Sequence, residues 1–204
     1  MANSQRIYLA SRSPRRSELL HQVGIAFEIL PLRDDLQHDA EVDEMPMAHE
    51  EPIAYVLRIA RAKAVMGWRQ IMAHRLPHHP VLAADTTVVL DDEIIGKPDN
   101  AEHARILLRR LSGKAHQVLT AIAVAYADRI ETALSTSTVE FRELGNEEIR
   151  RYVASGEPLG KAGAYAIQGF ASVYVAKIEG NYSNVMGLPM PLVRDFLNRA
   201  EVYL

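Results

Sequence analysis

Leu9-Ala10-Ser11-Arg12-Ser13-Pro14-Arg15-Arg16-Ser17-Glu18-Leu19-Leu20 is the stretch around which this chain is organised. The apolar residues 7–10 predict a short buried strand. Ser13 stands where a helix N-cap belongs, and Pro14 takes the first helical position, where its missing N–H costs nothing. Gly24 can end the helix in a left-handed conformation. The stretch therefore predicts a strand that leads directly into a helix.

Two arginines in the first turn of that helix are unusual. A helix N-terminus carries partial positive charge, so Arg15 and Arg16 are unfavourably placed there unless an anion joins them. Free backbone N–H groups, the hydroxyls of Ser11 and Ser13, and two guanidinium groups together form a good cradle for phosphate. The alternative is that both arginines are surface residues whose charge is screened by water.

Length and composition limit the classes of function. The chain has 204 residues, which favours one domain, with room for two lobes. Its net charge of −3 argues against general nucleic-acid binding, so a phosphate ligand should be small and held by a local cluster. The absence of cysteine excludes disulfides, zinc–thiolate sites and a cysteine nucleophile. The sequence also lacks an apolar signal core and a run long enough to span a bilayer, so we expect a cytoplasmic protein.

Asp85 is the most informative single residue. It lies in the middle of an apolar run, 81–90, which predicts a central strand buried on both faces. A carboxylate there is costly unless it is paired, hydrogen-bonded or bound to a metal, and such groups concentrate at functional sites. The alternative, an aspartate that ends a strand and caps a turn, is disfavoured by the β-branched residues that follow.

Periodicity predicts the remaining elements. The residues Ile53, Val56, Leu57, Ala60 and Ala64 form the buried stripe of a helix over 52–71. We expect further helices from Asn100 to Gly113, over 146–155 with Asn146 as the cap, and from about 191. We expect further strands over 94–95, 116–127, 130–140 and 172–179, with a tight turn at Asp128-Arg129 and a polar loop over 180–189.

Several polar residues outside these stripes are candidates for binding. Lys63 lies at the edge of the 52–71 stripe, whereas Arg58 and Arg69 are expected to be surface charges. The acidic segment 31–51 predicts a long loop from which a carboxylate, with Glu44 as the candidate, could reach a metal. The histidines that follow the helix, His74, His78 and His79, allow a weak metal site, although solvated loop histidines are the commoner case.

Two glycine-containing segments add further candidates. Lys97 lies between Gly96 and Pro98, so its fixed backbone could aim the ammonium at a phosphate. The stretch 160–169 is rich in small residues that permit close approach to a ligand, and Gln168 has both an amide donor and an acceptor, as recognition of a pyrimidine edge requires. The alternative is a plain glycine-rich bend. Neither a P-loop pattern nor G-x-G-x-x-G is present.

Five ordered motifs resemble the Maf family of nucleoside triphosphate pyrophosphatases. They are Leu9-Ala10-Ser11 with Ser13-Pro14-Arg15-Arg16, Ala84-Asp85-Thr86, Gly96-Lys97-Pro98, Lys161-Ala162-Gly163-Ala164-Tyr165 with Ile167-Gln168-Gly169, and Tyr182-Ser183-Asn184 with Gly187-Leu188-Pro189. The fourth motif resembles the branch that acts on dTTP and UTP rather than the branch that acts on 7-methyl-GTP. The resemblance implies a single α/β domain over 1–204, with an elongated mixed β-sheet flanked by helices and a central cleft between two lobes, as in Maf and ITPase-like proteins.

The resemblance also implies roles for individual residues. It places the general base on Asp85 and an acidic loop residue on Glu44. We expect a divalent cation, Mg²⁺ or Mn²⁺, on one or both of these carboxylates. Since one carboxylate does not easily serve as both a tight metal ligand and a free base, the choice between these roles for Asp85 stays open. The resemblance places specificity on Arg15, Thr86 and Gln168, and phosphate binding on Ser11, Arg15, Arg16, Lys63 and Lys97. The chain departs from the family pattern in a longer segment 32–43 and in Ala171-Ser172, which replaces an expected glycine pair.

The activity implied is hydrolysis of dTTP and UTP, and of modified pyrimidine nucleotides, to the monophosphate and pyrophosphate. The expected partner is thus a small nucleoside triphosphate, with no stable nucleic-acid or membrane binding, and the sequence leaves a homodimer open. Two alternatives remain at this point. One is a non-catalytic nucleotide-binding regulator of cell division, and the other is a 7-methyl-GTP pyrophosphatase.

Overall fold

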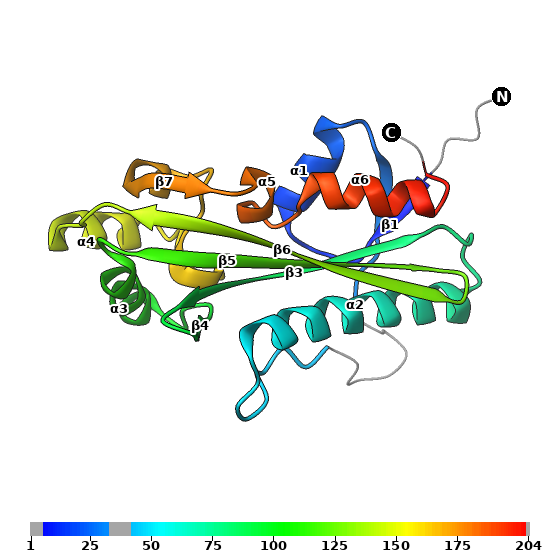
Figure 1. The fold of residues 1–204 in the computed structure, drawn as a ribbon, viewed down its shortest axis with the longest axis horizontal. Coiled ribbons are helices and arrows are strands. Elements are labelled where there is room, and N and C mark those ends of the chain that lie inside the picture. Colours follow the sequence, from blue (N-terminus) through cyan, green and yellow to red (C-terminus); the bar gives the residue numbers. More distant parts are fainter. Residues whose placement is uncertain (1–5, 33–41, 203–204) are drawn as a thin grey trace. The chain divides into compact units, whose positions relative to one another are not determined.

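The computed structural model describes residues 6–32 and 42–202, which form a seven-stranded sheet flanked by helices (Figure 1). The strand order is β2-β1-β3-β5-β6-β7, and β4 pairs with β3 off this path. The strands are β1 (Arg6–Leu9), β2 (Ala26–Ile29), β3 (Val81–Leu90), β4 (Glu93–Ile95), β5 (Ala115–Tyr126), β6 (Arg129–Phe141) and β7 (Val175–Glu179). β1 pairs in parallel with β2 and β3, whereas the β3–β4 and β6–β7 pairs are antiparallel. The predicted mixed α/β sheet is confirmed.

The described chain divides into two compact units. The first consists of Met1–Asp85, Thr120–Ser135 and Gly187–Leu204, and the second of Thr86–Leu119 and Thr136–Met186. The strands β3, β5 and β6 each contribute residues to both. The single domain and the central cleft stay predictions.

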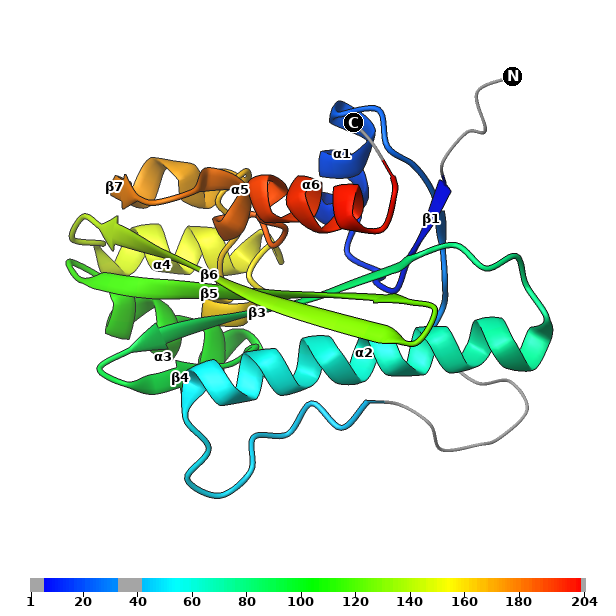
Figure 2. The ribbon, with the colours of Figure 1, turned by 45° about the vertical axis from the view of Figure 1, so that its right-hand side comes forward.

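In the first unit, a close approach of helix to sheet fixes the core. The helices are α1 (Pro14–Gln22), α2 (Pro52–His74) and α6 (Met190–Arg199). Figures 1 and 2 show α2 on one side of residues 81–85 of β3, with α1 and α6 on the other. A Cβ at Gly67 of α2 would lie 2.8 Å from Cγ1 of Val81 and 3.4 Å from Cβ of Ala10. α2 can therefore pack this closely on β1 and β3 only because position 67 has no side chain.

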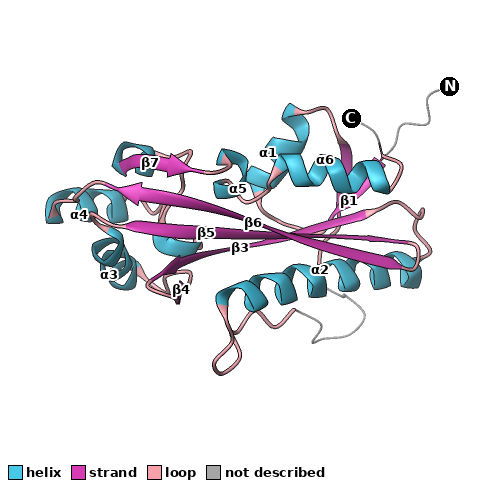
Figure 3. Ribbon diagram, in the orientation of Figure 1, coloured by secondary structure: helices cyan, strands magenta, loops and turns pink. Residues whose placement is uncertain are grey.

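The second unit has an aromatic core. Its helices are α3 (Ala101–Leu111), α4 (Asn146–Ala154) and the short α5 (Tyr182–Val185), with 3₁₀ turns η1 (Ala162–Ala164) and η2 (Phe170–Tyr174). Figure 3 shows α3 and α4 side by side, and the two are in contact. Tyr152, Tyr174 and Phe141 are each 1% exposed, and the ring of Tyr174 meets the other two edge-on.

Most predicted elements are confirmed, including β3 as a central strand and Asn100 as the cap of α3, whose side chain accepts from the His103 N–H at 2.9 Å. The α2 stripe begins later than predicted. Ile53 is 50% exposed and Leu57 is half-buried, whereas Ile59, which the prediction omitted, is fully buried. The buried face of α2 consists of Val56, Ile59, Ala60, Ala64, Gly67, Gln70 and Ile71.

Three local predictions are wrong by a few residues. The β5–β6 turn uses Ala127 and Asp128, with Ala127 at φ 54°, and alanine gives no sequence signal for that conformation. The cap of α4 is Gly145, whose N–H donates to the Glu148 carboxylate at 2.9 Å, and Asn146 is the first helical residue. Residues 172–174 belong to η2 rather than to a strand, because Tyr174 turns into the aromatic core.

The segments between these elements also differ in part from expectation. Within the predicted loop 31–51, residues 33–41 lie outside the described residues, and 42–50 contain neither helix nor strand. The predicted loop 180–189 contains α5, which Asn181 caps by accepting from the Asn184 N–H at 3.0 Å. Within residues 6–32 and 42–202, no helix combines the length and apolarity needed to cross a bilayer.

His116 predicts a pH dependence of folding. Its ring is 2% exposed, its Nε2 lies 2.9 Å from the Tyr165 hydroxyl, and burial lowers its pKa to about 4. The unfolded chain binds this proton near pH 6.5, so the free energy of unfolding should fall as pH decreases from 6.5 towards 4, by at most about 1.4 kcal/mol per pH unit. Urea unfolding at several pH values should show a flatter slope for His116→Gln, whereas the exposed control His74→Gln should keep the original slope.

Candidate active site

The ammonium of Lys63 joins two carboxylates that come from different elements. Its Nζ lies 2.8 Å from Oδ1 of Asp85, in the middle of β3, and 2.7 Å from Oε1 of Glu44, which precedes α2. The side chains of Lys63 and Asp85 are each 12% exposed, and that of Glu44 is 42% exposed. The expectation that a carboxylate within β3 needs a partner is confirmed. The alternative of a turn-capping aspartate is wrong, because β3 continues for five residues beyond Asp85.

Arg16 is buried, so the alternative that both arginines are solvated surface residues is wrong for Arg16. It is 8% exposed, its Nε donates to the Gly187 carbonyl at 2.7 Å, and its Nη1 donates to the Ser11 hydroxyl at 3.0 Å. The Ser11 oxygen also accepts from the Ser13 N–H at 3.2 Å, whereas the Ser13 side chain makes no capping bond. Ser13 is therefore the N-cap by position only.

The electrostatics of Arg16 show how the protein stabilises its cationic helix N-terminus. Burial lowers the pKa of Arg16, and the charges of Asp85 and Glu44 oppose that shift, while Arg15 adds to it. The protein's own carboxylates therefore supply part of the negative charge that the sequence required beside the two arginines. Together Arg15, Arg16 and Lys63 exceed the two carboxylates by one positive charge, which favours an anionic ligand.

The second unit joins two of the predicted binding segments. The Gly163 N–H donates to the Gly96 carbonyl at 3.1 Å and so holds the segment Gly96-Lys97-Pro98 against the stretch that begins at Lys161. Gly163 has φ 69°, and a Cβ there would lie 2.8 Å from Cγ2 of Val88. Glycine is therefore required both by the backbone conformation and by the space available.

A buried tyrosine and a glutamate hold the loop that carries Gln168. The Tyr152 hydroxyl donates to Oε1 of Glu157 at 2.8 Å, and Oε2 of Glu157 accepts from the Phe170 N–H at 3.0 Å. The Tyr152 oxygen also accepts from the Ala166 N–H at 3.3 Å. Gln168 itself is exposed. Sequence reasoning missed Glu157, because no periodicity marks a loop carboxylate that bonds a backbone thirteen residues away.

The structure therefore brings together Ser11, Arg16, Glu44, Lys63 and Asp85 in the first unit. Thr86 follows Asp85 on β3, so their side chains point to opposite faces of the strand. Lys97, Gln168 and Thr86 belong to the second unit. That all of these residues bind one ligand stays a prediction.

The oxygen donors of the first unit suit a hard divalent cation. The carboxylates of Glu44 and Asp85 both bond the Lys63 ammonium and therefore lie close together. Mg²⁺ commonly binds through one or two carboxylates together with phosphate oxygens and water. Within the described residues, no three His, Cys, Asp or Glu side chains form a metal-binding group. A site built on these two carboxylates therefore needs oxygens from the substrate. His78 and His79 instead lie beside the rings of Trp68 and Tyr8, each at 5.8 Å.

Comparison with known families decides the classification. The family described as Maf-like protein matches residues 6–200. The chain belongs to the Maf family. The motifs around Ser11, Asp85, Lys97 and Gln168 all lie within the matched range, so the resemblance predicted from them is confirmed.

Individual Maf relatives align over nearly the whole chain. The dTTP/UTP pyrophosphatase of Nitrosospira multiformis is 53% identical, covering 97% of this chain and 95% of its own length. The dTTP/UTP pyrophosphatase of Dechloromonas aromatica is 51% identical, covering 95% and 96%. Among solved structures, the Staphylococcus aureus Ham1 protein aligns over 96% of this chain and 99% of its own at a TM-score of 0.49 and 14% identity, a likeness too weak to add to the Maf assignment.

Removal of the Lys63 ammonium from this Maf protein should lower its stability. Lys63→Met leaves Asp85 and Glu44 without their shared cation, and we expect a loss of about 2–3 kcal/mol in the free energy of unfolding. Urea unfolding measures this loss. The control Lys114→Met removes an exposed pair of 3.6 Å with Asp91 and should cost under about 1 kcal/mol. A loss for Lys63→Met no larger than that for the control would contradict the pairing.

A double-mutant cycle tests the attachment of the Gln168 loop. A Cβ at Gly169 would overlap the Glu157 carboxylate, although the backbone there, at φ −98°, accepts alanine. Gly169→Ala should therefore cost about 1–3 kcal/mol of unfolding free energy in the unmodified protein, and clearly less in a Glu157→Ala background. Gly96→Ala, where a Cβ meets nothing within 4 Å, is the control. Equal costs in the two backgrounds would show that Glu157 does not hold this loop.

Proposed function

We propose that this Maf chain hydrolyses dTTP and UTP to the nucleoside monophosphate and pyrophosphate. The observation that carries the proposal is its identity of 51–53%, over nearly its whole length, with relatives named dTTP/UTP pyrophosphatase. The lysine-bridged pair Glu44 and Asp85 supports an enzyme, because a protein that only bound nucleotide would not need acidic groups beside the phosphates. We extend the proposed substrates to modified pyrimidine nucleotides.

In the proposed complex, the triphosphate binds through the cationic side chains. The proposed contacts are Ser11, Arg15, Arg16, Lys63 and Lys97. Because the Lys63 ammonium already bonds Asp85 and Glu44, phosphate oxygens would have to share it with these carboxylates. Substrate binding is therefore coupled to the arrangement of the two groups that we propose for catalysis and metal binding.

Glu44 and Asp85 are the proposed ligands of Mg²⁺ or Mn²⁺, which when bound neutralises charge on the phosphate oxygens. Asp85 has an alternative proposed role as the base, which orients a water molecule or accepts its proton for attack on phosphorus, because one carboxylate does not easily serve as both a tight metal ligand and a free base. The bond between the α- and β-phosphate groups breaks, which leaves the monophosphate and pyrophosphate. Positioning and charge neutralisation supply most of the acceleration, since phosphoryl transfer requires little covalent participation by the protein.

Specificity for the base is proposed to come from the second unit and from Arg15. The amide of Gln168 offers one donor and one acceptor edge, which matches the hydrogen-bonding edge of thymine or uracil. Thr86 is the other proposed specificity residue. The loop that presents Gln168 is fixed by Glu157 and Tyr152, as recognition by a single amide requires. We place the activity in the cytoplasm, where nucleoside triphosphates are present, with the free nucleotide as the partner.

Pyrophosphate release from a panel of dTTP, UTP, CTP, ATP, GTP and 7-methyl-GTP tests the proposal. We expect turnover of dTTP and UTP with Mg²⁺ or Mn²⁺, and its loss in EDTA. Asp85→Asn should lower kcat by roughly 10²–10⁴-fold at saturating substrate. The control Asp91→Asn changes an exposed turn residue at φ 54°, a conformation that asparagine tolerates well, and should leave kcat unchanged.

Other outcomes have definite meanings. Turnover of 7-methyl-GTP alone would keep the reaction and overturn the substrate assignment. Tight nucleotide binding without turnover would favour the non-catalytic regulator. Near-normal kcat for Asp85→Asn would remove Asp85 from the role of base while leaving the overall reaction in place.

A further inference from the structure

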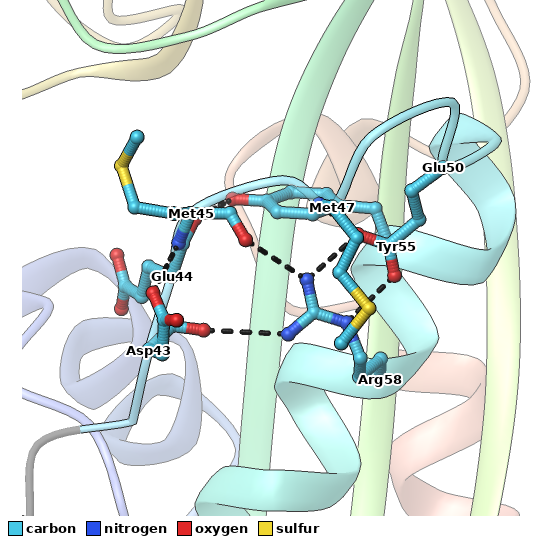
Figure 4. Close-up of polar contacts among 7 residues, drawn as sticks. All are labelled: Asp43, Glu44, Met45, Met47, Glu50, Tyr55 and Arg58. Atoms are coloured by element: carbon cyan, nitrogen blue, oxygen red, sulfur yellow. Dashed lines mark hydrogen bonds and ion pairs between the residues drawn. The ribbon is translucent and has the colours of Figure 1, made fainter.

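The segment that carries Glu44 is attached to α2 by side chains of that helix. The guanidinium of Arg58 donates through Nη1 to the Asp43 carbonyl at 3.3 Å and through Nη2 to the Met45 carbonyl at 3.1 Å (Figure 4). The Tyr55 hydroxyl donates to the carbonyl between them, that of Glu44, at 2.9 Å. Three consecutive carbonyls are therefore bonded by two residues of one helix.

Arg58 is itself fixed by Glu50. Its Nε lies 2.6 Å from Oε1 and its Nη2 lies 2.7 Å from Oε2, a two-point pairing that is stronger and more directional than an ordinary surface ion pair. The Glu50 side chain is 9% exposed and also accepts from the Met47 N–H at 3.0 Å. The bonds from Arg58 lower the pKa of Glu50 to about 2, so the pair stays charged at any pH used for an assay. We call Glu50, Tyr55 and Arg58 the loop clamp.

Polar bonds, rather than apolar burial, hold this segment. Residues 42–50 contain no helix or strand, so apart from local bonds such as that from the Glu50 N–H to the Met47 carbonyl at 3.1 Å, their backbone groups depend on side chains or water. The large apolar side chains of the segment point to solvent, with Met45 73% and Met47 61% exposed. Burial of apolar surface therefore contributes little to the position of Glu44, and the clamp accounts for the attachment.

The same helix carries both the clamp and Lys63. Arg58 and Lys63 are five residues apart on α2, which is about 7.5 Å along a rigid helix axis. Arg58 bonds the carbonyls on either side of Glu44, Tyr55 of the same helix bonds the Glu44 carbonyl, and the Glu44 carboxylate lies 2.7 Å from Nζ of Lys63. The clamp thus fixes where the Glu44 carboxylate lies relative to Lys63 and Asp85.

We propose that Arg58 is a positioning residue for the hydrolysis reaction, which acts with Glu50 and Tyr55 to hold the Glu44 carboxylate beside Lys63 and Asp85. It does not touch the reacting phosphate in this proposal. This inference rests on the proposed function and adds to it a set of residues that no local sequence signal assigns to the site.

Arg58→Lys is the decisive variant, because it keeps the positive charge but removes the planar guanidinium group. Only that group can donate to Glu50 and to both carbonyls at once. We expect faster hydrogen exchange of the backbone amides in residues 43–50. We also expect kcat for dTTP to fall by about tenfold to a hundredfold, with a smaller change in KM, because Glu44 is not expected to bind the anionic substrate directly. The Mg²⁺ concentration that gives half-maximal activity should rise.

Two further variants separate positioning from a general loss of structure. Arg69→Lys makes the same change at an exposed position of α2 and should leave exchange and kinetics unchanged. In a Glu44→Gln background, Arg58→Lys should cause little further loss of kcat, because the group that Arg58 positions is already absent. Unchanged hydrogen exchange in residues 43–50 of Arg58→Lys would overturn the proposal. It would also be overturned if the fold-loss of kcat in the double variant equalled the product of the losses in Glu44→Gln and Arg58→Lys.

Absence of turnover by the unmodified protein overturns the proposed function, and Mn²⁺ binding in the presence of dTTP, which then stays intact, decides the clamp. The proposal requires weaker Mn²⁺ binding by Arg58→Lys than by the unmodified protein, to a degree similar to that of Glu44→Gln. Equal binding by Arg58→Lys and the unmodified protein overturns it.

Discussion

The bond between the Lys63 ammonium and the Asp85 carboxylate is the constraint on which the first unit depends. Asp85 lies within a strand whose other residues are almost all buried, where an unpaired carboxylate would be strongly destabilising. Lys63 can reach it only because α2 packs closely on β1 and β3, and that approach requires a residue without a side chain at position 67. The packing of the core and the charge arrangement of the site are therefore one structural requirement.

The second cation of the first unit connects segments from the two ends of the chain. Arg16 bonds the Ser11 hydroxyl beside it and the Gly187 carbonyl 171 residues away, just before α6. Its charge is compensated in part by Asp85 and Glu44, so the arginine, the lysine and the carboxylates form one electrostatic group. This group keeps an excess of positive charge when Arg15 is included, as a protein that binds a triphosphate needs.

Each unit attaches one irregular segment through a glutamate and a tyrosine. In the first unit, Glu50 and Tyr55 act with Arg58 on residues 43–50. In the second unit, Glu157 and Tyr152 act on residues 166–170. The first segment exposes its large apolar side chains, Met45 and Met47, so apolar burial does not fix it, whereas the second also buries Ala166 and Ile167. Hydrogen bonds to the backbone leave the remaining side chains of such a segment available for a ligand.

The sequence by itself determined the elements and the family. Apolar periodicity located β3, the helices and the hairpin, because burial repeats along the chain with the period of each element. It also singled out Asp85, since one carboxylate in an apolar strand is visible without a structure. The ordered motifs then sufficed to identify the Maf family and to list the candidate residues, including Glu44 and Lys63.

Only the tertiary structure decided which of these residues bond one another and what holds them in place. Arg58 had the sequence pattern of a surface charge, yet it bonds carbonyls 13 and 15 residues earlier in the chain. Glu157 had no signal at all, and the position of the β5–β6 turn depended on an alanine in a left-handed conformation. The physical reason is common to these cases. Periodicity reports local burial, whereas a hydrogen bond between a side chain and a distant backbone depends on the path of the intervening chain, which no local pattern encodes.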